Sequence, residues 1–191
     1  MSLAIFEKFL EFAEAIIGVK ADLPAAIDAG ELESVLVSHG VALLYAHMEQ
    51  CFQKALEIKC HRCADIEVRT FALSVKDDKT GKLKMESVKG TFTRFGIDHK
   101  SGFGPELEAS NLKDTWDSVV NQRAMVAHYG ERASLTLAEL RLYYQDIRNV
   151  LGLICKALGL NAREVAAIST LIILPAAPVA APVPGPAAPI I

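Results

Sequence analysis

The sequence predicts an all-α fold, an antiparallel bundle of about five to six helices. Long apolar stripes recur in steps of three and four residues, whereas the alternation that marks β-strands is scarce. Polar and glycine-rich breaks separate these stripes, as expected for short connections between helices. Together these observations favour helices packed on helices and leave no material for a sheet.

Length and charge set the outer limits of the prediction. The 191 residues fit one domain, and a hydrophobic content of 51% supplies a core. The net charge of -3 provides no global basic field for a long nucleic acid, so an RNA site would have to be local. We interpret residues 1–173 as one helical domain and residues 174–191, rich in alanine and proline, as an extended tail.

The cysteines and the apolar runs predict a cytoplasmic protein. Four cysteines occur, and residues 1–20 are too acidic and amphipathic for a secretory signal, so reduced thiols are expected. Every apolar run of about 18 residues is interrupted by charge or proline, and we therefore expect no membrane span.

The first half of the chain predicts two helices. Apolar residues at helical spacing place the first over residues 3–19, before a break around Pro24. A long second helix follows and continues toward Leu73, with a seam suited to antiparallel packing. The seam consists of Val37, Val41, Leu44, Met48, Cys51, Ala55 and Ile58. The polar run 77–82 then predicts a turn.

The middle of the chain predicts a shorter helix, a loop and a longer helix. Residues 85–95 form the shorter helix, and three glycines place a loop over residues 96–105. The longer helix begins near Asn111, a candidate N-cap, and runs to Tyr129. Gly130 follows as a candidate helix-ending residue.

Capping signals place the last helices. Thr136 and Glu139 fit a capping box that opens a helix reaching Leu158. Asn161 is a candidate cap for a final short helix that ends at about Ile173.

Arg123 lies near the middle of the apolar arc of helix 111–129, an unusual place for a charge. Its stem can pack while the guanidinium reaches water, or the charge can form a buried ion pair with Glu49 or another carboxylate. The functional interpretation is a cleft or dimer seam at the point where the apolar stripe emerges.

His128 follows Arg123 by five residues, which on an ideal α-helix turns the two side chains about 140° apart. They meet only if the helix frays or turns near Gly130, if Arg123 reaches around, or if two chains contribute. This geometry favours a site shared across a two-fold axis. Histidine exchanges protons near neutral pH, which suits a general acid or base.

The segment 119–130, VVNQRAMVAHYG, resembles the R-x4-6-H signature of HEPN domains. Segment 41–56 and the loop Phe95–Asp98 are similar to the RiboL-PSP-type branch of that family. The resemblance extends over roughly residues 31–158 and implies a HEPN-like bundle, commonly a homodimer whose two motifs face each other.

The resemblance also implies a metal-independent endoribonuclease, of the kind found in toxin–antitoxin, phage-defence and RNA-processing systems. Arg123 would hold the scissile phosphate of the RNA, and His128 would act as general acid or base. Cleavage would leave a 2′,3′-cyclic phosphate. An antitoxin or other regulatory protein is a candidate partner.

One residue departs from the family pattern. Many active members carry a polar residue directly after the arginine, whereas this chain has Ala124. Asn121 and Gln122 are candidates to supply a substitute hydrogen bond. The alternative hypothesis is a non-catalytic HEPN module that dimerises or holds a partner protein, and a third is an adaptor that uses the tail.

Further polar residues are weaker candidates. Glu49 is either a surface carboxylate or a group that orients Arg123 or His128 across the bundle. Basic side chains that could border the motif and bind RNA are Lys113, Arg132, Arg141 and Arg148. Each of them, taken singly, also fits a solvated helix face.

The segment Cys60-His61-Arg62-Cys63 has the C-x-x-C spacing, but a structural zinc site needs about four ligands and no second pair exists. We therefore predict neither a metal nor a cofactor. Phosphate-binding loops with a lysine, G-x-S-x-G and H-E-x-x-H motifs are also absent from the sequence.

Overall fold

The computed structural model describes residues 3–19, 28–77, 83–100 and 102–170, and within these ranges it contains helices and no strand. The all-α prediction is confirmed. The elements are α1 (Leu3–Gly18), α2 (Ala29–His61), α3 (Ile66–Asp77), α4 (Met85–Arg94), α5 (Phe103–Ala109), α6 (Leu112–Ala124), the π-helix η2 (Met125–Tyr129), α7 (Leu137–Ala157) and α8 (Ala162–Thr170). The predicted tail 174–191 and most of the predicted turn 77–82 lie outside the described residues.

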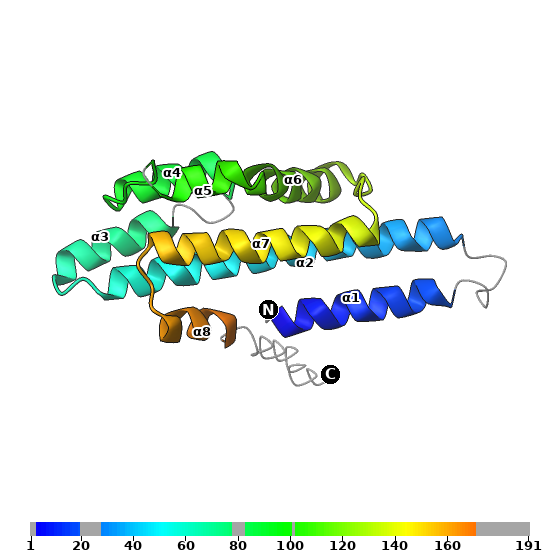
Figure 1. The fold of residues 1–191 in the computed structure, drawn as a ribbon, viewed down its shortest axis with the longest axis horizontal. Helices are drawn as coiled ribbons and strands as arrows, with labels where there is room; N and C mark the ends of the chain where they lie inside the picture. The colour runs from blue at the N-terminus through cyan, green and yellow to red at the C-terminus, as the bar shows by residue number, and fades with distance from the viewer. Residues whose placement is uncertain (1–2, 20–27, 78–82, 101, 171–191) are drawn as a thin grey trace, which may run out of the picture.

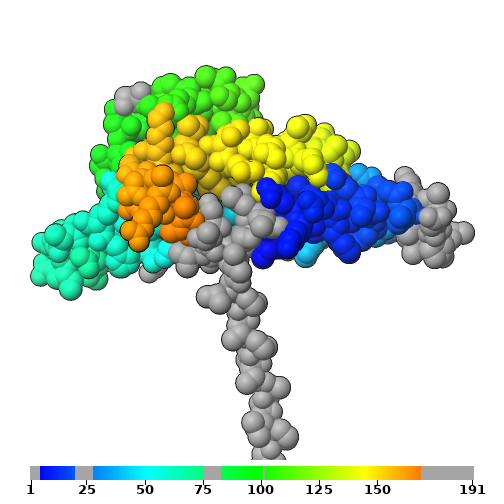
Figure 2. Space-filling view, turned by 60° about the horizontal axis from the view of Figure 1, so that its bottom comes forward, coloured from blue at the N-terminus to red at the C-terminus, as the bar shows by residue number. Residues whose placement is uncertain are grey.

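The helices form three layers, and the α2–α7 pair is the middle layer (Figure 1). α4, α5 and α6 lie on one side of this pair, and α1 and α8 lie on the other. α3 packs against α2 and extends past the body of the bundle (Figure 2). Because α6 and α1 cover opposite faces of the central pair, side chains that pair with α1 are separated from those at the end of α6.

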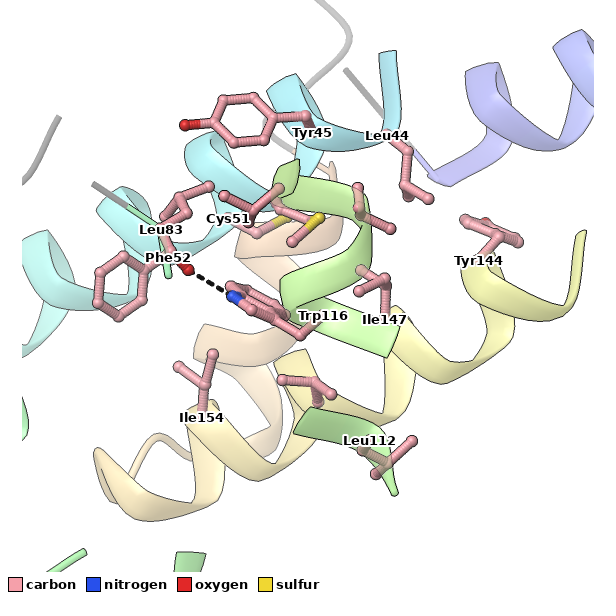
Figure 3. Packing of buried hydrophobic residues seen from close by; sticks show 14 of the residues in the cluster. Leu44, Tyr45, Cys51, Phe52, Leu83, Leu112, Trp116, Tyr144, Ile147 and Ile154 are labelled. Carbon is pink, nitrogen blue, oxygen red and sulfur yellow. Dashed lines mark hydrogen bonds between the residues drawn. The ribbon is translucent and has the colours of Figure 1, made fainter. Parts of the chain in front are cut away.

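The core centres on Trp116 of α6, which is fully buried (Figure 3). Its indole nitrogen donates to the Leu83 carbonyl at 2.5 Å, which attaches the segment before α4 to α6. The Met85 backbone N–H donates to the Asp117 carboxylate at 2.8 Å and strengthens the same junction. In the same cluster of buried residues lie aromatic and aliphatic side chains from α2 and α7, among them Phe52, Ile147 and Ile154.

The predicted capping box is present at the start of α7. The Thr136 hydroxyl accepts from the Glu139 backbone N–H, and the Glu139 carboxylate accepts from the Thr136 backbone N–H. Hydrogen bonds from the Thr136 backbone and hydroxyl lower the pKa of the Glu139 carboxyl. Asn161 and Glu164 exchange the same two bonds before α8, so these two predicted caps are confirmed. Asn111 directly precedes α6 as expected, but it has a φ of 52° and its side chain makes no capping hydrogen bond, so the predicted cap there is wrong.

The second helix is shorter than predicted. It ends at His61, and α3 begins separately at Ile66, so the expected continuation toward Leu73 is wrong. The Asp65 carboxylate accepts from the backbone N–H groups of Glu67 and Val68, which starts a new helix in a new direction. The apolar pattern continues through the break and therefore concealed it.

The predicted loop 96–105 contains the start of a further helix, α5. The Gly104 backbone N–H donates to the His99 carbonyl at 2.7 Å, and the buried Phe103 ring packs against Phe92 with centroids 5.0 Å apart. The glycines therefore shape a tight entry to α5. The additional α5 and the separate α3 explain why the described residues contain eight α-helices instead of five or six.

In the part of the chain that the structure describes, no helix is both long enough and apolar enough to cross a membrane.

Candidate functional site

The helix that carries the R-x4-H segment changes its winding immediately after Arg123. α6 is α-helical to Ala124, and η2 continues as a π-helix from Met125 to Tyr129. The Gly130 backbone N–H donates to the Met125 carbonyl, an i to i+5 bond, and Gly130 adopts a φ of 65°. The helix therefore ends at the predicted glycine, through a turn type that often occurs at functional sites.

The π turn brings Arg123 and His128 together within one chain. Arg123 Nη1 lies 3.3 Å from His128 Nε2. Residues five apart on an α-helix point in different directions, but i to i+5 winding places them one above the other. Of the three ways to meet that the sequence left open, the structure shows a change in the helix just before Gly130. The preference for a site shared across a two-fold axis rested on regular α-helical geometry. A second chain is not needed to form the pair.

The contact between the two side chains has only one direction in which it can be a hydrogen bond. A guanidinium carries only donors, so Arg123 is the donor and His128 Nε2 is the acceptor. Nε2 is the nitrogen that can later take a proton, provided that the guanidinium moves to another acceptor.

The aromatic ring of Tyr45, on α2, lies against the guanidinium of Arg123. The guanidinium carbon lies 4.9 Å from the centre of the Tyr45 ring, in cation–π geometry, and Tyr45 is only 6% exposed. Burial and the nearby Glu49 carboxylate raise the pKa of the Tyr45 hydroxyl, whereas Arg123 lowers it. Tyr45 therefore stands in the electrostatic fields of both Glu49 and Arg123.

The contact with the Tyr45 ring explains why Arg123 lies in an apolar arc. Its side chain is partly buried, so the stem packs on α2 while the guanidinium rests on the aromatic ring and reaches His128. Sequence analysis missed Tyr45. The available signal was its position one helical turn before Glu49, beside the seam residue Leu44.

The connection from η2 to α7 is held by side chains on both sides. Gln122 exchanges two hydrogen bonds with Ser134, at 2.6 Å and 3.0 Å, and thus ties the connection back to α6. Ser38 of α2 accepts from the Ala133 backbone N–H at 3.0 Å. These bonds fix both ends of the segment that carries His128. The Gln122 amide is therefore engaged with Ser134.

Most of the predicted basic residues are not near the pair. Arg132 pairs with Glu31 at 2.5 Å, and Lys113 lies in the first turn of α6, at the opposite end from Arg123. Arg141 and Arg148 pair with Glu14 and Glu7 on α1, across the central layer. Asn121 is exposed on the last turns of α6. The structure therefore does not assemble these residues into a basic rim.

The C-x-x-C segment is part of a structural junction. Arg62, between its two cysteines, pairs with Glu164 of α8 and donates to the Gly159 carbonyl at 2.8 Å. Among the described residues, no three His, Cys, Asp or Glu side chains cluster closely enough to hold a metal ion.

An apolar cavity of about 180 Å³ lies between α2, α7 and α8, away from the Arg123–His128 pair. Two of the residues lining it are cysteines, and burial raises the pKa of Cys51 to about 12 and that of Cys155 to about 11. Thiols with such pKa values stay protonated at neutral pH and are poor nucleophiles. Neither thiol therefore supplies a reactive nucleophile in this cavity.

Comparisons with known proteins point to the same region of the sequence. The family model RiboL-PSP-HEPN matches residues 5–159, which include the Arg123–His128 segment and the helices that support it. Searches of the curated proteins and of the solved structures gave no match.

Proposed function

This chain belongs to the RiboL-PSP-HEPN family, and on that premise we propose that it is a metal-independent endoribonuclease with Arg123 and His128 as its catalytic residues. The observation that carries the proposal is the 3.3 Å contact between the guanidinium and the imidazole within one chain. It places a fixed cation beside a proton acceptor, the two groups that cleavage of RNA by its own 2′-hydroxyl requires.

Cleavage begins when the scissile phosphate of the RNA binds Arg123. The phosphate oxygens accept hydrogen bonds from the guanidinium and free the lone pair on His128 Nε2. The 2′-hydroxyl loses its proton to Nε2 and its oxygen attacks phosphorus. The bond from phosphorus to the 5′-oxygen breaks as a proton reaches that oxygen. The products are a 2′,3′-cyclic phosphate and a 5′-hydroxyl end.

The reaction needs two proton transfers, one from the 2′-hydroxyl and one to the leaving 5′-oxygen. One imidazole that takes up the first proton does not at the same time supply the second. We therefore propose that the protein acts as a homodimer in which a second copy brings its own His128 to the other side of the phosphate. Light scattering at micromolar concentration tests this, and a monomer with full activity would contradict it.

The proposed biological role is that of a toxin or defence effector acting on RNA in the cytoplasm, held in check by an antitoxin or other regulatory protein. Its support is the family membership. Induced expression should arrest cell growth in the wild type but not in the His128→Ala variant. Equal arrest by both would contradict the role.

The function is tested by incubating a mixed RNA pool with the folded wild type in EDTA, alongside Arg123→Ala and His128→Ala. Arg141→Ala is the matched control, because it removes an arginine whose ion pair lies on the α1 side. We expect the wild type and the control to cut, and the two site variants to lose about 10²- to 10⁴-fold in rate. Unchanged cleavage by either site variant would overturn the assignment.

A non-catalytic HEPN interaction module is the second candidate. The observation that favours it is Ala124, the last residue of α6, which leaves no polar side chain directly after Arg123. If the folded wild type cuts no RNA in the pool, this candidate is preferred. Pull-down with the wild type and a variant of the exposed η2 surface would then test for a protein partner.

A further inference from the structure

We propose that Tyr129, together with Met125, forms a stacking shelf for an unpaired RNA base next to the scissile phosphate. This inference rests on the proposed ribonuclease function and concerns how that site selects its substrate. Tyr129 directly follows His128 in the chain and is 71% exposed. Such a large exposed aromatic surface beside a phosphate-binding pair is the arrangement that single-stranded RNA recognition uses.

The shelf is a continuous part of the π turn. None of the η2 residues is buried, and Met125 is 37% exposed. Met125 and Tyr129 are four residues apart, so they lie on neighbouring positions of one turn. The shelf thus combines a flexible thioether with an aromatic ring, both suited to contact with a flat base.

The distribution of charge favours a base over further phosphates as the occupant. Arg132 is engaged with Glu31, and Arg141 and Arg148 are engaged with α1. These three arginines are therefore already paired with carboxylates in the absence of RNA. Base stacking supplies a non-ionic contribution to affinity of about 1–3 kcal/mol for each base.

The other aromatic ring at the site is unsuitable for this role. Tyr45 is 6% exposed, and the Arg123 guanidinium covers its face. A base that stacks on Tyr129 must be free of its own helical stack, which a paired strand does not allow. The shelf therefore predicts preference for unpaired over paired RNA at the cleavage position.

The test measures binding of a fluorescent single-stranded RNA whose 2′-hydroxyls are methylated, so that wild-type protein binds it without cutting. The same strand annealed to its complement is the paired probe. The variants are Tyr129→Leu, which removes the aromatic face, and Tyr129→Phe, which retains it. Phe71→Leu is the matched control, because Phe71 is 69% exposed on α3, far along the chain and outside the site.

We expect Tyr129→Leu to weaken binding of the single strand by about 5- to 100-fold, the range that corresponds to one lost stack. Tyr129→Phe and Phe71→Leu should bind within about twofold of the wild type. Paired RNA should bind more weakly, with no further loss in Tyr129→Leu. The inference is overturned if Tyr129→Leu binds as tightly as the wild type, or if Tyr129→Phe loses as much as Tyr129→Leu.

Three further outcomes separate this inference from its alternatives. If Tyr129→Leu turns a wild-type dimer into a monomer in light scattering, Tyr129 is a subunit contact and the inference fails. If the wild type cuts RNA through Arg123 and His128 while Tyr129→Leu keeps the wild-type KM, the inference fails and the proposed function stands. If Tyr129 controls RNA binding but no RNA is cut, the proposed function fails and the shelf remains.

Discussion

The two ends of the continuous helix formed by α6 and η2 differ in almost every physical respect. At the α6 end, Trp116 is fully buried and hydrogen-bonded to the Leu83 carbonyl. At the η2 end, no residue is buried, the winding is π-helical, and Arg123 and His128 contact each other beside solvent. One continuous helix therefore carries a buried packing end and an exposed end with the Arg123–His128 pair, about three turns apart.

The difference indicates that the residues that stabilise the packing of α6 and the residues of the candidate site lie at different ends of the helix. The buried end fixes the position of α6 on α2 and α7, so the exposed end does not have to contribute packing. Freed from that requirement, the last turn can adopt a winding that brings residues five apart together. Mutations at the two ends should therefore affect different measurements, and the predictions below test that separation.

The largest expected effect is at the packing end. Trp116→Ala removes a fully buried indole and should lower the free energy of unfolding by about 3–5 kcal/mol. His128→Ala changes an exposed side chain and should alter that free energy by no more than about 0.5 kcal/mol. Urea denaturation of both variants checks the comparison. If His128→Ala lowered the free energy of unfolding as much as Trp116→Ala does, the proposed difference between the two ends of the helix would be contradicted.

A smaller effect is expected where the two regions meet, at Tyr45. Tyr45→Leu removes the ring under Arg123 and should slow RNA cleavage by about tenfold, from the loss of a partly desolvated cation–π contact. Tyr45→Phe retains the ring and should keep most of the rate. Rates measured with saturating RNA distinguish this positioning role from weaker binding. An equal loss in both variants would assign the effect to the hydroxyl.

The connection after η2 should show a smaller effect still. Gln122→Ala removes both hydrogen bonds to Ser134 and should lower the free energy of unfolding by about 1 kcal/mol. It should also reduce cleavage severalfold, because the segment that carries His128 becomes less well fixed. Denaturation and cleavage measured on the same preparation check both. A stable variant with an unchanged rate would show that the bonds do not position His128.

The smallest expected effect concerns the buried thiols, which should not react with alkylating reagents at neutral pH. Burial raises the pKa of Cys51 to about 12 and that of Cys155 to about 11, so both remain protonated well below those values. In folded protein at pH 7, iodoacetamide should label the partly exposed Cys63 and leave these two unmodified. Mass spectrometry reports the sites. Rapid labelling of Cys155 would indicate a more open cavity than described.

The helices and their caps were readable from the sequence because their signals are local. Apolar spacing located α1 and α7, and the pairs Thr136–Glu139 and Asn161–Glu164 marked helix starts that the structure contains. The break before α3 was missed because the apolar pattern continues across it. The one local signal was Asp65, whose carboxylate caps α3.

The sequence singled out the two residues of the candidate pair but did not predict their geometry. Arg123 and His128 stood out by residue type and spacing. Their contact depends on a π turn, which helix propensities do not predict. Tyr45 was missed because its role depends on how α6 lies on α2. Arg141 and Arg148 were misplaced because their helix face packs toward α1, and only the tertiary structure determines that.

The central claim is that Arg123 and His128 act as one unit on RNA. Its most direct test is a cycle of cleavage rates for the wild type, Arg123→Ala, His128→Ala and the double variant, all shown to be folded. The account predicts that the double variant is no slower than the slower single variant, because removing either residue already disables the unit. Losses that multiply in the double variant, or a double variant that cuts RNA at the wild-type rate, would contradict the claim.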